Sequence, residues 1–287
     1  MVDKQSIEIS CTDGIVLSAA LYVPPSKAKA AVMVAPATGI KKTFYNSFAM
    51  HLAEQGYGVI CFDNRGIGDS NKGPINAHNA SLIHWGRLDM TAVLDELMKR
   101  FPGTSYHLIG HSAGGQLLGL MENAAKVRSM FNFASSSGSL RNMHYPYKIL
   151  AAFFLNVFIP MSNLVFGQAN CQWVGMGEPL PKAVAKQWSR WCNGAGYVAT
   201  DFGKAIDDHY YDELKLPSKW LHATDDGIAI LENVQDMIRV YSQMPAEIVT
   251  LRPEDWGYTE IGHMKFFSSR CQELWPMALD WLEAHRG

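Results

Sequence analysis

The sequence predicts an α/β protein with a mostly parallel central sheet, helices on both faces of that sheet, and a mainly helical insertion. The chain has 287 residues, which is long enough for one large α/β domain with a sizeable core. Strand-like and helix-like hydrophobic patterns alternate along the chain, and this alternation is typical of parallel sheets covered by helices. Residues 141–212 interrupt the alternation and are expected to form the insertion.

The first part of the chain contains one edge and the centre of the predicted sheet. Residues 6–24 alternate as a hairpin whose turn contains Asp13 and Gly14. Apolar runs predict buried strands over 30–36, 58–63 and 105–112. Helical spacing predicts helices over 44–55, 81–101 and 116–124, and the Pro102-Gly103 pair should end the second of these.

The same rhythm returns after the insertion. We expect strands over 218–225 and 246–253, and helices over 230–244 and 273–285. The predicted organisation is therefore an α/β core in two parts, 1–140 and 213–287, with a lid or cap insertion at 141–212 between consecutive core strands.

Composition and charge favour a small-molecule ligand. The chain carries 25 Lys plus Arg against 27 Asp plus Glu, a formal charge of −2, so it lacks the basic field of a nucleic-acid-binding protein. The five cysteines are scattered without a Cys-x-x-Cys pair, and we interpret them as reduced core residues. The first ten residues do not resemble a signal peptide, and no run of eighteen uninterrupted apolar residues predicts a membrane span. We expect a cytoplasmic protein.

Ser112 lies in the segment GHSAGG, between a predicted strand and a predicted helix. A strand that delivers a nucleophile into a sharp turn holds it in a strained conformation, and side chains at flanking positions would collide with neighbouring backbone. Gly110 and Gly114 would provide that space. The alternative is a glycine-rich turn whose serine only caps the following helix. We predict that Ser112 is a catalytic nucleophile.

A serine nucleophile needs a histidine as base and a carboxylate that orients the histidine, which follow it in the chain order Ser, acid, His. His263 lies in a loop between the last strand and the terminal helix, whereas His285 ends that helix and is expected to be solvated. Asp226 follows the strand at 218–225 and is the predicted acid. The alternative is that Asp225 orients the histidine and Asp226 caps the next helix.

An oxyanion hole needs two backbone N–H donors, one of which comes from the residue after the nucleophile, here Ala113. The second should come from the loop APATGIKK after the strand at 30–36. We assign it to Ala37, with Thr38 as the alternative.

Several segments together resemble the α/β-hydrolase superfamily: GHSAGG, DNRGIGDS, the aspartate after KWLHATD, and GHMKFF near the end. The PATGIKK region and EPLPKAVAKQWSRWC are similar to a bacterial group of predicted α/β hydrolases whose substrates are poorly defined. The resemblance implies an α/β-hydrolase fold, with Ser112, His263 and Asp226 as nucleophile, base and acid. Many relatives have His-Gly where this chain has Ala35-Pro36. Asp63 and Arg65 of DNRGIGDS are expected to be structural.

These residues predict a serine hydrolase that cleaves a carboxylic ester or thioester of a small to medium, partly apolar substrate through an acyl-enzyme. An esterase, lipase or thioesterase needs no cofactor for this reaction, and none is predicted. No metal site is predicted either. The cluster IDDHYYDE at residues 206–213 has no helical His-x-x-x-His or Cys pairing, and it fits a solvated segment that returns from the insertion to the core. The alternatives are an acyltransferase with the same triad and a non-catalytic ligand-binding protein on this fold.

The first half of the insertion, residues 147–167, has too many apolar side chains for a solvated excursion. Asn156, Pro160, Ser162 and Asn163 interrupt it too early for a membrane span. We predict a lid whose apolar face forms the wall of the substrate pocket. The expected substrate-binding residues are Thr38, His111, Phe153, Phe154, Phe158 and Trp173. The alternatives are a homodimer interface and a helix on a membrane surface.

Overall fold

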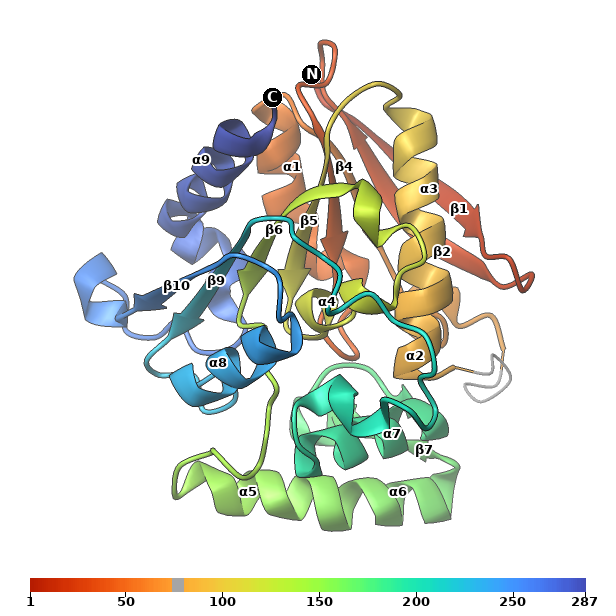
Figure 1. Ribbon diagram of the computed structural model, residues 1–287, viewed down its shortest axis with the longest axis vertical. Coiled ribbons are helices and arrows are strands. Elements are labelled where there is room, and N and C mark those ends of the chain that lie inside the picture. The colour runs from red at the N-terminus through yellow and green to blue at the C-terminus, as the bar shows by residue number, and fades with distance from the viewer. Residues whose placement is uncertain (74–79) are drawn as a thin grey trace.

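The computed structural model describes residues 1–73 and 80–287. These residues form an eight-stranded sheet, mostly parallel, in the order β1-β2-β4-β3-β5-β6-β9-β10 (Figure 1). Strand β2 pairs antiparallel with both of its neighbours, β1 and β4, and the other pairings in this sheet are parallel. The strands of the sheet are β1 (Asp3–Ser10), β2 (Val16–Val23), β3 (Ala31–Ala35), β4 (Gly58–Phe62), β5 (Tyr106–His111), β6 (Val127–Phe133), β9 (Ser218–Ala223) and β10 (Ala246–Leu251).

Helices cover both faces of the sheet, as the sequence predicts. In Figure 1, α1 and α9 lie on one face, and α3 and α8 lie on the other. The α-helices are α1 (Asn46–Glu54), α2 (Leu82–His84), α3 (Thr91–Arg100), α4 (Ala113–Gln116), α5 (Tyr147–Phe153), α6 (Ile159–Phe166), α7 (Lys182–Asn193), α8 (Leu231–Val240) and α9 (Pro276–His285). Two π-helical segments continue the helical path, Trp85–Met90 between α2 and α3 and Phe154–Phe158 between α5 and α6.

The central strands are buried on both faces, which explains their uninterrupted apolar sequences. Every residue of β3 and of β4 is buried. The edge strand β1 instead alternates between exposed and more buried positions. Its hairpin with β2 turns where expected, and Gly14 adopts a φ of 84° there. The five cysteines are buried and unpaired.

The helix after Ser112 is much shorter than the predicted 116–124. It ends at Gln116, and a 3-10 turn at Leu118–Leu120 follows. Other segments take the carbonyl groups that a longer helix would use: Tyr211 Oη donates to the carbonyl of Gln116 at 2.6 Å, and the Tyr210 N–H donates to that of Gly119 at 2.7 Å. The return from the insertion is therefore not simply solvated, since Tyr211 is fully buried beneath this turn.

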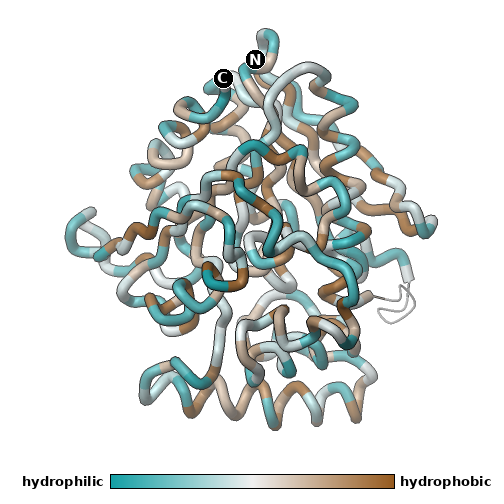
Figure 2. The backbone as a smooth tube through the Cα atoms, in the orientation of Figure 1, coloured by the Kyte–Doolittle hydropathy of each residue, from teal (hydrophilic) through white to brown (hydrophobic). Residues whose placement is uncertain are grey.

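Between β6 and β9 the chain leaves the sheet and builds a separate layer. Helices α5 and α6 and the π-helical segment between them form one continuous helix, which lies across the bottom of the molecule in Figure 1, with α7 between it and the core. A two-stranded ladder of β7 (Gln168–Ala169) and β8 (Leu180–Pro181) completes the layer. Figure 2 shows hydrophobic positions both in the central strands and along this bottom helix.

Candidate active site

Ser112 occupies a strained turn between β5 and α4. Its backbone has φ 48° and ψ −110°, a conformation that side-chain-bearing residues rarely adopt. The Ser112 side chain makes no capping hydrogen bond to the helix, so the turn does not use it as a cap. At Gly110 a Cβ atom would lie 2.5 Å from the Gly115 nitrogen, and at Gly114 it would collide with the carbonyl of Ala35. The two glycines are therefore required for steric reasons.

His263 and Asp226 meet across two loops. Asp226 follows β9, His263 follows β10, and His263 Nδ1 lies 2.7 Å from Asp226 Oδ2. Asp226 Oδ1 also accepts hydrogen bonds from the N–H groups of Ile228 at 2.7 Å and Ala229 at 3.0 Å. Burial alone would raise the pKa of Asp226, but His263 and the two N–H donors outweigh it and hold the pKa below its usual value. An ionised Asp226 can only accept, so Nδ1 of His263 carries the proton.

The carboxylate of Asp225, the alternative acid, contacts backbone N–H groups of the loop that carries His263. Its carboxylate oxygens accept hydrogen bonds from the N–H groups of Ile261 at 2.9 Å and Gly262 at 3.0 Å. The two adjacent aspartates therefore have different contacts: Asp225 binds the backbone just before His263, and Asp226 binds the His263 imidazole.

A buried hydrogen-bonded chain, here called the Tyr45–His111 relay, links the loop after β3 to the His263 loop. The Ala37 N–H donates to Tyr45 Oη at 2.9 Å, and Tyr45 Oη donates to His111 Nδ1 at 2.8 Å. His111 Nε2 donates to the carbonyl of His263 at 2.9 Å. Burial, with the neighbouring His263, lowers the pKa of His111 to about 3, so this imidazole stays neutral and can accept at Nδ1.

The relay corrects two predicted roles. The N–H of Ala37 is already bonded to Tyr45, so it is not free to stabilise an oxyanion. Among residues 1–73 and 80–287, the N–H of Thr38 has no acceptor, and that residue lines the cavity above Ser112. Ala113 begins α4, so its N–H has no acceptor within the helix. His111 is fully buried and is not part of the cavity wall, so it does not contact substrate.

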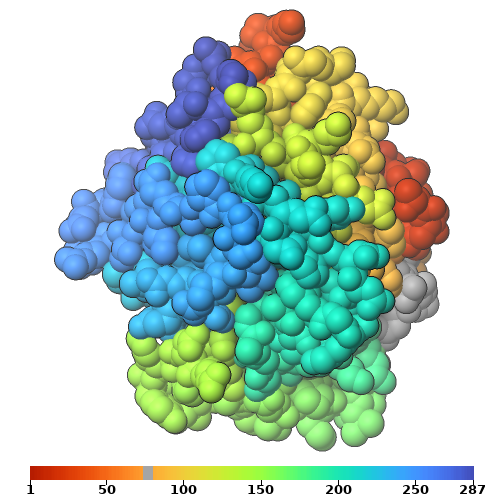
Figure 3. Space-filling model, in the orientation of Figure 1, coloured from red at the N-terminus to blue at the C-terminus, as the bar shows by residue number. Residues whose placement is uncertain are grey.

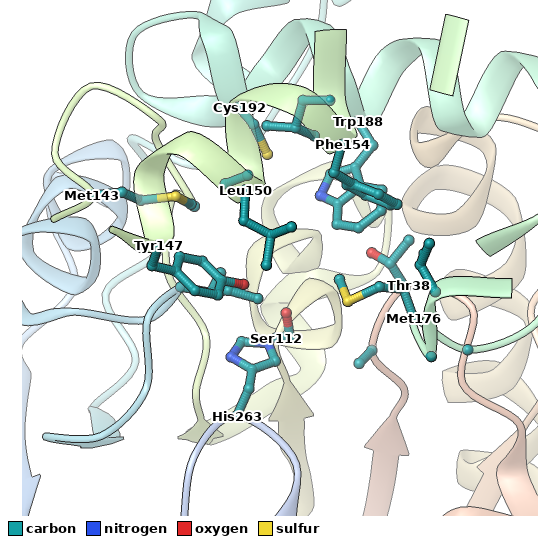
Figure 4. A pocket seen from close by; sticks show the side chains of 18 of the residues that line it. Thr38, Ser112, Met143, Tyr147, Leu150, Phe154, Met176, Trp188, Cys192 and His263 are labelled. Atoms are coloured by element: carbon teal, nitrogen blue, oxygen red, sulfur yellow. The ribbon is translucent and has the colours of Figure 1, made fainter. Parts of the chain in front are cut away.

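Ser112 and His263 lie together on one side of a cavity of about 340 Å³, and side chains of the insertion lie opposite them (Figure 4). The wall is mostly apolar. Phe154 stacks on Phe158 with ring centroids 5.5 Å apart, and it meets Trp188 edge to face at 5.6 Å. The predicted Phe153, Phe154, Phe158 and Thr38 all line the cavity. Trp173 does not: it is 61% exposed and packs edge to face against Phe166 instead.

Sequence reasoning missed several lining residues. They include Gln116, Met143, Tyr147, Leu150, Met176, Trp188, Cys192 and Tyr197. The helical spacing of Tyr147, Leu150 and Phe154 could have revealed one face of the wall. Two buried polar atoms in the wall, Gln116 Oε1 and Tyr197 Oη, have no hydrogen-bond partner within the described part of the chain.

The residues expected to be structural do hold neighbouring loops. Asp63 accepts from the Nζ of Lys42 at 2.8 Å, and the buried Arg65 donates to Asp89 at 2.6 Å. In the part of the chain that the structure describes, no three His, Cys, Asp or Glu side chains are placed to share a metal ion.

Comparison with known proteins shows the family of this chain. A family model described as "Serine aminopeptidase, S33" matches residues 26–252. The chain belongs to the serine aminopeptidase S33 family. The family is one of α/β hydrolases, so the resemblance seen in the sequence and the predicted fold class are both confirmed.

Solved structures that resemble this S33 family member share its fold at low sequence identity. The Bacillus coagulans carboxyl esterase superposes with a TM-score of 0.67 at 12% identity, covering 98% of each chain. The Pyrococcus furiosus esterase Pf2001 gives 0.62 at 15% identity, covering 99% of this chain and 92% of the other. The esterase domain from Rhodothermus marinus gives 0.62 at 17%, covering 99% and 100%. A search of curated proteins found no match.

Proposed function

We propose that this protein is a serine hydrolase that cleaves a carboxylic ester or thioester through an acyl-enzyme on Ser112. One observation carries the proposal: the imidazole of His263, hydrogen-bonded to Asp226 at 2.7 Å, shares the cavity with the strained Ser112. Because Nδ1 donates to Asp226, the free lone pair of His263 is on Nε2, the nitrogen a serine base requires. Membership of a hydrolase family supports the reaction type.

In the proposed mechanism, Ser112 Oγ attacks the substrate carbonyl while His263 Nε2 takes its proton. The negative charge that develops on the carbonyl oxygen is stabilised by the N–H groups of Thr38 and Ala113. The protonated His263, stabilised by Asp226, then returns the proton to the leaving alcohol or thiol. Water, deprotonated by the same imidazole, attacks the acyl-enzyme and releases the acid, and Ser112 regains its proton.

We further propose that the insertion acts as a lid and its wall selects the acyl or alkyl part of the substrate. A cavity of about 340 Å³ with a mostly apolar lining suits a small to medium, partly apolar group. Phe154 and Phe158 form a stacked pair in that wall, so their size should set the length of chain that fits.

Turnover of p-nitrophenyl esters of graded acyl chain length tests both proposals. The wild type should hydrolyse short and medium chains, and Ser112→Ala should hydrolyse none above background. The variant Phe154→Ala/Phe158→Ala should shift the preferred chain length upward, because it enlarges the cavity. Trp173→Ala is the matched control, since this aromatic residue lies outside the cavity. An unchanged chain-length profile in the double variant would refute the selector role, and turnover by Ser112→Ala would refute the nucleophile.

A further inference from the structure

The exposed apolar side chains of this protein are concentrated on the insertion. Fourteen large hydrophobic residues are exposed in the described part of the chain, and eleven of them lie between Tyr145 and Val174. Most belong to the continuous helix Tyr147–Phe166, which forms the lower rim of the molecule in Figure 3. We call these exposed side chains of the helix, together with Trp173 and Val174, the outer apolar face. Leu150, Phe153, Val157, Met161 and Leu164 repeat along it at helical spacing.

By length and composition this helix of 20 residues could cross a membrane, and 33% of its apolar window is buried. Its polar residues, however, tie it to the rest of the insertion. Ser162 Oγ donates to the carbonyl of Gln168 at 2.9 Å and accepts from the N–H of Asn170 at 2.9 Å. Asn156 bonds to Asn193 of α7. Because these hydrogen bonds hold the inner side, the helix stays on the protein with its apolar side outward.

The charge pattern around the outer apolar face suits a lipid surface. From Ile149 to Pro181 the sequence contains a single charged residue, Glu178. Arg141 is exposed just before the helix, and Lys148 in its first turn donates to the Arg141 carbonyl at 2.8 Å. An apolar strip that begins beside two cations fits acyl chains below a layer of phosphate headgroups.

The outer apolar face is continuous with the cavity that holds Ser112. Leu150, Phe153 and Val174 are 63%, 56% and 48% exposed on this face, and all three also line the cavity. A second copy of the chain seated there would cover this side of the cavity.

We propose that the outer apolar face docks on the surface of a phospholipid bilayer, and that an amphiphilic ester passes from the bilayer into the cavity. The second half of this statement rests on the proposed hydrolase function, and the first half does not. Docking would place the chain on the membrane without crossing it.

Flotation with phosphatidylcholine vesicles, with and without an equal amount of phosphatidylglycerol, tests the docking. The wild type should bind both, and more tightly when phosphatidylglycerol is present. The variant Met161→Gln/Leu164→Gln/Val165→Gln should lower the partition coefficient at least about tenfold, because it removes apolar area that enters the bilayer. None of the three residues lines the cavity, so turnover of a soluble short-chain ester should not change. Leu231→Gln, at an exposed leucine outside the face, is the control and should bind vesicles like the wild type.

The outcomes separate the docking from the enzymatic proposal. If the wild type binds vesicles and the triple variant does not, docking is supported even when no ester is hydrolysed. In that case only the proposed hydrolase function is refuted. If the triple variant loses turnover of a vesicle-embedded ester but keeps normal turnover of the soluble ester, both the docking and the passage of substrate from the bilayer are supported. The docking proposal is overturned if the wild type does not bind vesicles, or if the triple variant binds them as tightly as the wild type. A wild-type dimer in light scattering that the triple variant converts to monomer also overturns it, because a second copy would then cover the face.

Discussion

Replacing Tyr45 with Phe would remove the single oxygen atom at the centre of the Tyr45–His111 relay. The ring would still fit, because Tyr45 is fully buried and packs edge to face against Phe267 at 4.8 Å. The Ala37 N–H and His111 Nδ1, both buried, would each lose their partner. Leaving a buried polar group unsatisfied costs about 1–3 kcal/mol, so the variant should lose roughly 2–6 kcal/mol of unfolding free energy.

Activity should fall as well, because the relay joins the two loops that flank the reacting atoms. Displacement of such loops by a fraction of an ångström typically costs on the order of ten- to a hundredfold in rate, and we expect a decrease of that size in kcat. The loss should be in kcat more than in KM, since neither Tyr45 nor His111 lines the cavity.

Urea denaturation and esterase kinetics would measure the two effects, with Tyr57→Phe as the matched control. The Tyr57 hydroxyl donates at 3.0 Å to Glu283, whose side chain is 48% exposed, so water can replace that bond. The control should cost less than about 1 kcal/mol. If Tyr45→Phe is as stable as Tyr57→Phe and turns over ester like the wild type, the relay does not position the two loops.

Three further predictions concern the acid, the pH dependence of stability and Tyr197. Asp226→Asn should lower kcat by about 10³- to 10⁴-fold by favouring the wrong imidazole tautomer, whereas Asp225→Asn should cost less than about tenfold because it weakens only backbone contacts of the loop; the reverse order, at matched stability, would make Asp225 the acid. Burial lowers the pKa of His111 to about 3 and that of His107 to about 4, from 6.5, so on acidification below about pH 6.5 the unfolded chain binds protons that the folded protein excludes. The unfolding free energy should therefore decrease from pH 7 to pH 4.5 by several kcal/mol, at about 1.4 kcal/mol per unit of pKa difference for each histidine; denaturation curves with the same midpoint at both pH values would contradict this. Tyr197→Phe removes a buried hydroxyl without a partner among the described residues, so it should raise the unfolding free energy by about 1 kcal/mol; a decrease would mean that the hydroxyl is bonded in solution.

The sequence predicted the sheet and the sharp turn at Ser112 because both depend on local sequence pattern. Buried runs such as AVMVA read as parallel strands, and Gly110 and Gly114 are required by close backbone contacts. Asp226 and His263 lie close together because each follows one of two neighbouring parallel strands, β9 and β10, and loops at the carboxyl ends of such strands are adjacent.

What the sequence could not predict depends on contacts between distant residues. The N–H of Ala37 is unavailable because a 3-10 turn at Lys42–Tyr45 brings the Tyr45 hydroxyl to it. The short α4 results from Tyr211, 95 residues beyond Gln116, whose hydroxyl bonds to the Gln116 carbonyl. Trp173 packs against Phe166 on the exposed side of the insertion instead of facing the cavity. Hydrophobic spacing records none of these pairings.

The central claim is that Ser112 is the nucleophile, and labelling with a fluorophosphonate followed by intact-protein and peptide mass spectrometry tests it most directly. We predict one adduct per chain, located on Ser112, because His263 and Asp226 activate this hydroxyl. Ser112→Ala should take up no label while keeping the circular dichroism spectrum of the wild type, and Asp226→Asn should be labelled far more slowly. No adduct on the folded wild type, or an adduct on another residue that persists in Ser112→Ala, would contradict the account.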